Sequence, residues 1–136
     1  LVLAWISINN SINLTPIIFY FGAIFWTLGY DTIYGYQDIK DDEIIGLKST
    51  SIKFKKNPYK FLTLCYSVFL LNLLITGFFI ELNSFFYLTF ILIILQMFYF
   101  QLKKLDIENS LECFNIFKSN NFLGLLVLIG LIGGKI

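Results

Sequence analysis

The stretch FLTLCYSVFLLNLLITGFFI at residues 61–80 decides the fold class, because it runs for twenty residues without a charged side chain. A helix of this length rises 1.5 Å per residue and covers roughly 30 Å, the hydrocarbon thickness of a bilayer. The whole chain has the same character, since 57% of its 136 residues are hydrophobic and 14% are charged. The sequence therefore predicts an all-α, polytopic transmembrane helix bundle.

Similar apolar stretches lie on both sides of this segment. Residues 81–83 are enough for a tight turn only, so the next apolar stretch is predicted to return as an antiparallel neighbour. Thr15 and Pro16 are predicted as the N-cap and first residue of the earliest span. Gly124, Gly130, Gly133 and Gly134 predict close helix approach in the last one. The predicted spans are residues 17–36, 61–80, 84–102 and 122–136.

The chain opens with an apolar segment, residues 1–8, which is followed by a short polar connection at residues 9–13. The opening segment has neither the basic region nor the cleavage site of a signal peptide, so we interpret it as the stub of a helix that began upstream. About four complete spans plus this stub are expected. The chain is interpreted as a fragment, or as one part of a protein that is encoded in two pieces.

The charged residues predict the orientation in the membrane. Nine of the ten lysines fall in the segments that the predicted spans place on one side, and this side is expected to be cytoplasmic. The location predicted is a bacterial inner (cytoplasmic) membrane. The net charge is only +1, and the charged residues fall into two clusters. Nucleic acid is therefore not expected as a partner.

The acidic stretch YDTIYGYQDIKDDE, residues 30–43, holds five of the nine acidic residues. If the preceding helix continued through it, Asp38 and Asp42 would each lie within about 20° of Asp31 on one stripe. Three carboxylates on one stripe repel one another, so a multivalent cation or a cationic ligand is their expected companion. Oxygen ligands without histidine favour Mg²⁺. The alternative is a solvated loop whose acids offset neighbouring lysines.

Two other polar segments are candidates for binding. Lys48, in GLKST at residues 46–50, either reflects the ordinary basic bias of cytoplasmic loops or neutralises an anionic ligand. Lys118-Ser119-Asn120-Asn121 is predicted to begin the final helix. A lysine at a helix N-terminus opposes the helix dipole, which suggests an anionic partner for Lys118. Tyr34 and its aromatic neighbours also fit an interfacial aromatic belt.

The wording of these motifs resembles a known family. The segment WTLGYDTIYGYQDIKDD at residues 26–42, followed by IGLKST at residues 45–50, closely resembles the second aspartate-rich motif of the UbiA superfamily of membrane prenyltransferases. The similarity is to the branch that acts on 4-hydroxybenzoate. CFNIFKSNNFLG at residues 113–124 resembles the family's segment before its last helix. The resemblance implies that residues 1–136 are the C-terminal half of a single nine-helix domain, without the first aspartate-rich motif.

The resemblance implies Mg²⁺-dependent transfer of a polyprenyl group from polyprenyl diphosphate to the ring of 4-hydroxybenzoate, in ubiquinone biosynthesis. The missing N-terminal half would supply the other metal motif, so the fragment alone is expected to be inactive. The implied residues are Asp31, Asp38, Asp41 and Asp42 for the metal, Asp31, Asp38, Asp42 and Lys48 for catalysis, and Tyr34, Lys48, Lys118 and Asn121 for diphosphate or substrate. The alternatives are a menaquinone, haem or chlorophyll-type prenyltransferase, and a noncatalytic membrane protein that binds or transports a cation.

Overall fold

The computed structural model describes residues 2–9 and 13–136, and this part of the chain contains helices and connecting turns but no strand. The predicted all-α class is therefore confirmed. The predicted polar connection at residues 9–13 lies mostly outside the described residues. The elements are α1 (Val2–Asn9), α2 (Leu14–Gly35), α3 (Ile39–Ile45), α4 (Thr50–Phe54), α5 (Pro58–Phe79), α6 (Ser84–Ile94), the π-helix η1 (Leu95–Leu102) and α7 (Ser110–Lys135).

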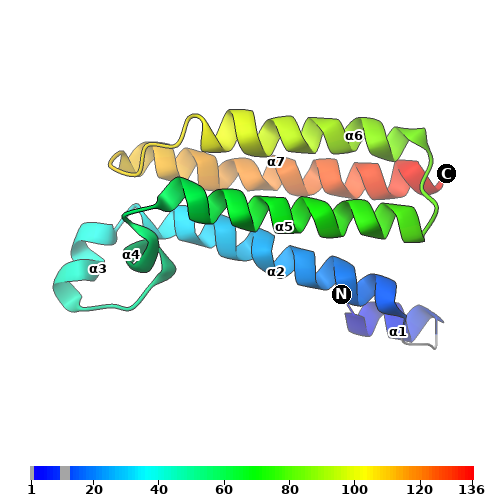
Figure 1. Cartoon of the computed structure of the whole chain (residues 1–136), viewed down its shortest axis with the longest axis horizontal. Coiled ribbons are helices and arrows are strands. Elements are labelled where there is room, and N and C mark those ends of the chain that lie inside the picture. Colours follow the sequence, from blue (N-terminus) through cyan, green and yellow to red (C-terminus); the bar gives the residue numbers. More distant parts are fainter. Residues whose placement is uncertain (1, 10–12) are drawn as a thin grey trace.

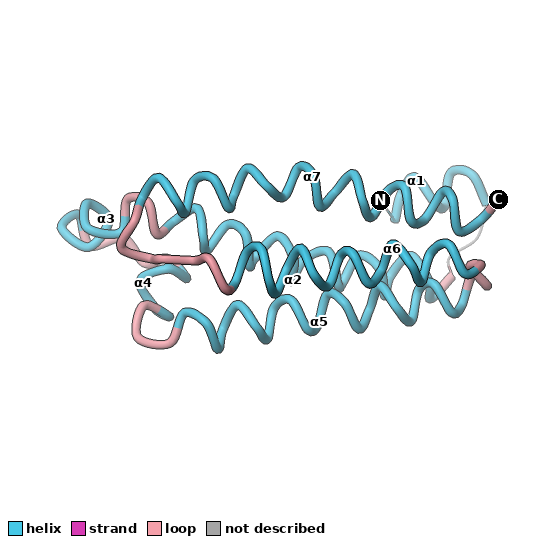
Figure 2. The backbone as a smooth tube through the Cα atoms, turned by 90° about the horizontal axis from the view of Figure 1, so that it is seen from above, coloured by secondary structure: helices cyan, strands magenta, loops and turns pink. Residues whose placement is uncertain are grey.

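The long helices lie side by side along the molecule (Figure 1). They are α2, α5, α6 continued by η1, and α7, and the second view shows that they form a bundle rather than a flat layer (Figure 2). The short helices α3 and α4 lie at one end, and both chain termini lie at the other. The bundle thus has one end that carries all the residues of the acidic stretch after α2.

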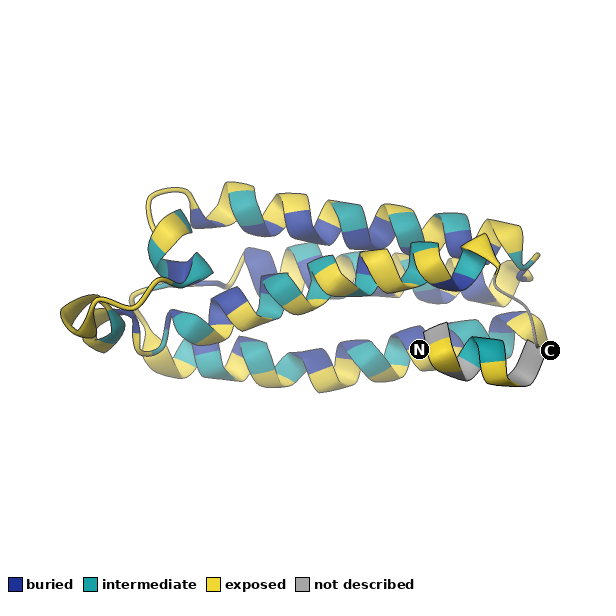
Figure 3. Ribbon diagram, turned by 90° about the horizontal axis from the view of Figure 1, so that it is seen from below, coloured by how far each residue is buried: buried dark blue, intermediate teal, exposed yellow. Residues whose placement is uncertain are grey.

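The helices bury one face each and expose the other (Figure 3). Along α5 the fully buried side chains recur every three or four residues, from Leu62 through Cys65 and Phe69 to Leu73. This spacing keeps one stripe of an α-helix toward the same neighbours. Many large apolar residues outside the stripe are exposed, among them Leu64, Leu71 and Phe78.

Three helices in the described part of the chain are long and apolar enough to cross a bilayer: Pro58–Phe79, Ser84–Leu102 and Ser110–Lys135. They cover the last three predicted spans except for the final residue of the spans 61–80 and 122–136. α2 has 22 residues, as α5 does, but it does not meet this criterion, so the first span stays a prediction as a membrane crossing.

The final helix starts earlier than predicted. α7 begins at Ser110, where the side chain of Asn109 accepts a hydrogen bond from the Glu112 amide at 3.2 Å. The N-cap therefore lies before a stretch that was predicted to be loop, and the predicted helix start at Lys118 is wrong. Because Lys118 lies inside α7 and not at its N-terminus, the helix dipole gives no reason to expect an anionic partner for it.

The first long helix also begins differently. Its N-cap is Asn13, in an extended conformation, so the predicted cap at Thr15 is wrong. Pro16 takes the third helical position instead of the first. Its missing N–H is harmless there, since the first amides of a helix have no intrahelical partner.

The turn between α5 and α6 is anchored to the end of α7. Glu81 adopts a left-handed φ of 54°, and the Leu82 amide bonds the Gly77 carbonyl at 3.0 Å. The Asn83 amide then donates to the Gly134 carbonyl at 2.8 Å. A Cβ on Gly130 would lie 2.5 Å from the Thr89 hydroxyl, and one on Gly134 would lie 2.7 Å from the Phe86 Cβ. The predicted close approach of helices is therefore confirmed at Gly130, Gly133 and Gly134, but not at Gly124, where a Cβ would meet Trp26 at an ordinary 3.4 Å.

Candidate functional site

The acidic stretch does not form one continuous helix. α2 ends at Gly35, and the amides of Tyr36 and Gln37 turn back to the carbonyls of Ile33 and Tyr34 at 3.2 and 3.1 Å. A new helix, α3, starts at Ile39. The expectation that Asp31, Asp38 and Asp42 share one helical stripe is therefore wrong, because the chain changes direction between the first acid and the others.

The four aspartates now belong to three settings. Asp31 is exposed near the end of α2, and Asp38 is exposed at the N-cap of α3. Asp41 and Asp42 lie in the first turn of α3, where negative charge is favourable to the helix dipole. Within residues 2–9 and 13–136, no three acidic, cysteine or histidine side chains are grouped closely enough to hold a metal ion.

The segment after α3 folds back against the end of α2. Gly46 closes α3 with a left-handed φ of 76°, a backbone conformation that suits glycine. Ser49 then caps α4, accepting a hydrogen bond from the Ile52 amide at 3.3 Å. The hydroxyls of Thr32 and Thr50 bond each other at 2.7 Å, so α2 and α4 are joined directly.

This junction is closely packed. Thr32 is fully buried, and its hydroxyl also donates to the Leu28 carbonyl at 2.6 Å, which leaves the Thr50 hydroxyl to donate to Thr32. A Cβ on Gly35 would lie 2.5 Å from the Ser51 hydroxyl, so glycine is what lets α4 approach. No role was predicted for these residues from the sequence. The small and hydroxyl side chains near the acidic residues were the feature that could have indicated close packing.

Two lysines of this region, Lys48 and Lys55, differ in their partners. Lys48 is exposed and makes no ion pair with any residue that the structure describes. Lys55 pairs with Glu43, with its Nζ 2.8 and 2.9 Å from the two carboxylate oxygens. Both partners are well exposed, so the pair contributes about 0–1 kcal/mol. The alternative interpretation, in which acidic residues of this segment offset neighbouring lysines, thus describes Glu43.

A groove of about 450 Å³ lies between α2 and α7. Its aromatic wall is formed by Trp26, Tyr30 and Phe117, and Asn121 lines it from α7. The exposed Tyr34 packs its ring 4.7 Å from that of Phe117. The predicted residues Tyr34 and Asn121 are therefore brought to one face of the molecule.

A second groove, of about 360 Å³, runs along α2 and ends at Asp31. It shares Ala23 and Thr27 with the groove between α2 and α7, so the two are adjacent. Lys118, by contrast, is exposed and holds its Nζ 4.1 Å from the ring centre of Phe114. The structure thus places Asp31 and Asn121 on two adjacent grooves, and Lys118 lines neither of them.

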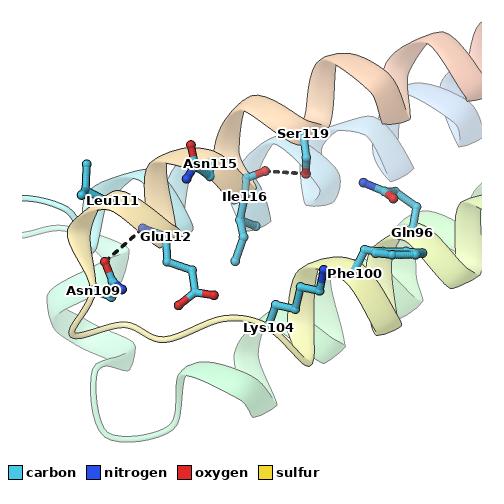
Figure 4. Close-up of a pocket in the computed structure, with 9 residues that line it drawn as sticks. All are labelled: Gln96, Phe100, Lys104, Asn109, Leu111, Glu112, Asn115, Ile116 and Ser119. Atoms are coloured by element: carbon cyan, nitrogen blue, oxygen red, sulfur yellow. Dashed lines mark hydrogen bonds between the residues drawn. The ribbon is translucent and has the colours of Figure 1, made fainter.

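The opposite flank of α7 carries a pocket of about 540 Å³ that was not predicted (Figure 4). Lys104 of the loop after η1 and Glu112 of α7 supply its charged groups, and the Ser119 hydroxyl donates to the Ile116 carbonyl at 2.7 Å. Its full lining is Gln96, Phe100, Lys104, Asn109, Leu111, Glu112, Asn115, Ile116 and Ser119. None of the aspartates contributes to it.

The chain is similar to known proteins over nearly all its length. It is 38% identical over 131 residues to 4-hydroxybenzoate octaprenyltransferases of Francisella tularensis, in subsp. novicida strain U112 and subsp. tularensis strain SCHU S4, with 93% of this chain and 44% of the relative covered. It is 34% identical over 139 residues to the mitochondrial 4-hydroxybenzoate polyprenyltransferase of Bos taurus, with 99% of this chain and 36% of the relative covered.

The chain thus spans less than half the length of these curated relatives. No solved structure matches it. Residues 1–126 match the profile of the UbiA prenyltransferase family, which agrees with the resemblance of the aspartate motif. The apolar helices and this match together indicate an integral membrane protein. The chain belongs to the UbiA prenyltransferase family.

Proposed function

We propose that this chain forms one wall of a 4-hydroxybenzoate polyprenyltransferase of ubiquinone biosynthesis, which transfers a polyprenyl group from its diphosphate to the aromatic ring. The observation that carries the proposal is the 2.7 Å bond between the hydroxyls of Thr32 and Thr50. It joins the two halves of the family motif and keeps Asp31 and Lys48 at the same end of the bundle. The names of the bacterial and bovine relatives support the acceptor.

The residues fit a hard divalent cation by the chemistry of their donors. Asp31, Asp38, Asp41 and Asp42 offer carboxylate oxygens alone, and Mg²⁺ prefers such ligands while keeping several waters and substrate phosphate oxygens. A bound Mg²⁺ would supply charge stabilisation to the departing diphosphate. Because the described residues provide no three-carboxylate cluster, the remaining ligands are proposed to come from the diphosphate and the other half of the domain.

The roles of this chain's own residues follow from their positions. Lys48, exposed and unpaired within the described residues, would neutralise negative charge as the allylic carbon–oxygen bond breaks. The ring carbon ortho to the phenol hydroxyl would then attack the allylic carbon, and loss of its proton would restore aromaticity. Asn121 and Tyr34, on the face of the α2–α7 groove, are proposed to position the substrates, with Lys118 contributing charge nearby. Apolar side chains of α2 would exclude water.

The membrane orientation is part of the proposal. The α3–α4 end is placed on the cytoplasmic side, because nine of ten lysines fall in segments at that end. A bacterial inner membrane is proposed as the location. This chain alone is expected to be inactive, since the metal cage would be incomplete.

The experiment is a chimera in which this chain replaces the matched segment of the Francisella relative. Membranes that contain it are expected to transfer an octaprenyl group to 4-hydroxybenzoate in the presence of Mg²⁺, and to lose transfer with EDTA. Product on a different aromatic acceptor alone would contradict the acceptor assignment. An inserted, folded chimera that transfers nothing to any acceptor would contradict the proposed function.

A further inference from the structure

Gln101 is a polar side chain with no exposed surface, buried between the helices near the C-terminal end of η1. It lies in the π-helix η1, where backbone hydrogen bonds join residues i and i+5 instead of i and i+4. The set of residues that face the bundle interior therefore shifts between α6 and η1. The Tyr66 hydroxyl donates to its Oε1 at 2.6 Å. Its Nε2 donates to the Ser119 hydroxyl at 3.0 Å and to the Asn120 Oδ1 at 3.3 Å. All three polar contacts are therefore made by other helices.

Asn120 extends this network to the first long helix. The Trp26 indole Nε1 donates to Asn120 Oδ1 at 3.0 Å. The Asn120 amide nitrogen donates to the carbonyls of Ile116 and Phe117 at 3.2 and 3.1 Å. If the amide were turned over, its nitrogen would face two donors and its oxygen two carbonyls, so only one orientation satisfies every partner. The Trp26 indole N–H and the two backbone carbonyls select this orientation, and Gln101 supports it with a second hydrogen bond to the Asn120 Oδ1.

The network ends at the wall of a groove. Trp26 and Asn120 both line the groove between α2 and α7, beside Asn121. The Trp26 ring also stacks on Phe69, with centroids 5.1 Å apart. The indole is thus held by the stacking contact with Phe69, by an edge contact with Tyr30 at 5.9 Å between centroids and by one hydrogen bond. The acceptor of that bond, Asn120, also bonds Gln101.

Stability alone gives little reason for this arrangement. Polar contacts between membrane helices stabilise them only weakly on average, and a leucine would fill a similar volume without needing three partners. A buried amide with every partner satisfied instead specifies one arrangement of its neighbours. The arrangement specified here is the one that places Trp26 in the groove.

We propose that Gln101 is a positioning residue, which orients Asn120 so that the Trp26 indole forms a fixed wall of the α2–α7 groove. The placement of Trp26 follows from the contacts of this chain. That the groove then receives a substrate rests on the proposed function. Gln101 acts through Asn120 and Trp26, and it does not itself line the groove.

Hydrogen exchange of the Trp26 indole N–H tests the positioning directly. The full chain, labelled with ¹⁵N-tryptophan in micelles, gives two indole signals, which a Trp5→Phe variant assigns. Gln101→Leu is expected to accelerate exchange at Trp26 about tenfold, because Asn120 loses a donor that fixes its orientation. Gln96→Leu, in the same π-helix and with no side-chain hydrogen bond among the described residues, is the matched control and should leave exchange unchanged.

Tyr66→Phe provides a milder variant in case Gln101→Leu does not fold. It removes one of the three contacts of Gln101 and keeps the ring, so a smaller acceleration is expected with unchanged helix content by circular dichroism. Unchanged Trp26 exchange in a folded Gln101→Leu or Tyr66→Phe chain would overturn the proposal.

The consequence for the groove is measured in the chimera described above. Gln101→Leu is expected to raise the KM of prenyl transfer severalfold with a smaller change in kcat. The reason is that a misplaced groove wall weakens substrate binding more than it slows the chemical step. Faster exchange at Trp26 with KM unaltered would overturn the link to the groove. An inactive parent chimera would instead count against the proposed function, while the exchange result would still decide whether Gln101 positions Trp26.

Discussion

Asp31, Asp38 and Asp41 are exposed at the α3–α4 end of the bundle, whereas Gln101 and Tyr66 in its interior are fully buried and hydrogen-bonded to each other. The exposed acids have no cationic partner among the described residues, since the single ion pair there joins Lys55 and Glu43. The buried residues have satisfied each other. This contrast supports the proposal that the acidic end binds a ligand, while the buried polar residues hold several helices together.

The largest effect is expected at the acidic end. Asp38→Asn in the chimera should lower kcat/KM by about 100-fold or more, because it removes a proposed metal ligand without changing side-chain size. Glu43→Gln is the matched control, since Glu43 lies in the same stretch but pairs with Lys55. Steady-state transfer assays at several Mg²⁺ concentrations measure both. Equal losses in the two variants would remove the distinction between ligand and loop acids.

The next effect is one of packing between α6 and α7. Gly130→Ala places a Cβ 2.5 Å from the Thr89 hydroxyl and should destabilise the chain by about 1–2 kcal/mol. Gly124→Ala meets Trp26 at 3.4 Å, an ordinary contact, and should change stability by less than about 0.5 kcal/mol. Unfolding by SDS titration in micelles compares them. Equal stabilities would show that the helices are not closely packed at Gly130.

Much of this architecture could be predicted from the sequence. Long uncharged stretches specify helices that are apolar enough for a bilayer, and residues 84–102 match their predicted span at both ends. The end of α2 was predicted within one residue, at Tyr36. The start of α7 was not, because Asn109 and Ser119 are both good cap residues, and only burial of Cys113 and Ile116 against the bundle selects the first.

The site was predictable in its residues and not in its geometry. The family motif identifies Asp31 and Lys48, but helical periodicity could not show which direction the chain would take after α2 ends at Gly35. That direction depends on α4 packing back onto α2, where Thr32 bonds Thr50 and Gly35 lies against Ser51. The residues of each pair are well separated in the sequence. The buried network escaped prediction for the same reason, since Gln101 and Trp26 are 75 residues apart.

A smaller effect tests the junction that presents the acids. Thr32→Val removes the hydroxyl that bonds Thr50 and should destabilise the chain by about 1 kcal/mol while keeping the shape of the side chain. Thr63→Val, on the exposed side of α5, is the control and should be nearly neutral. The same SDS titration measures both. A neutral Thr32→Val would mean that the junction does not depend on this bond.

The smallest effect is expected for the exposed ion pair. Glu43→Gln should change the free energy of unfolding by less than about 1 kcal/mol, because the Lys55 pair is solvated. The change should shrink further at high salt. A large, salt-independent loss of stability would instead assign Glu43 to the structural core of this end.

The most direct test of the account is the Mg²⁺ dependence of geranyl diphosphate binding to the chimera. Equilibrium titration should show tight binding with Mg²⁺, weak binding with EDTA, and weak binding of the Asp38→Asn variant under both conditions. Diphosphate affinity that is the same with and without Mg²⁺, or unaltered in Asp38→Asn, would contradict the claim that the acidic end holds a metal–diphosphate complex.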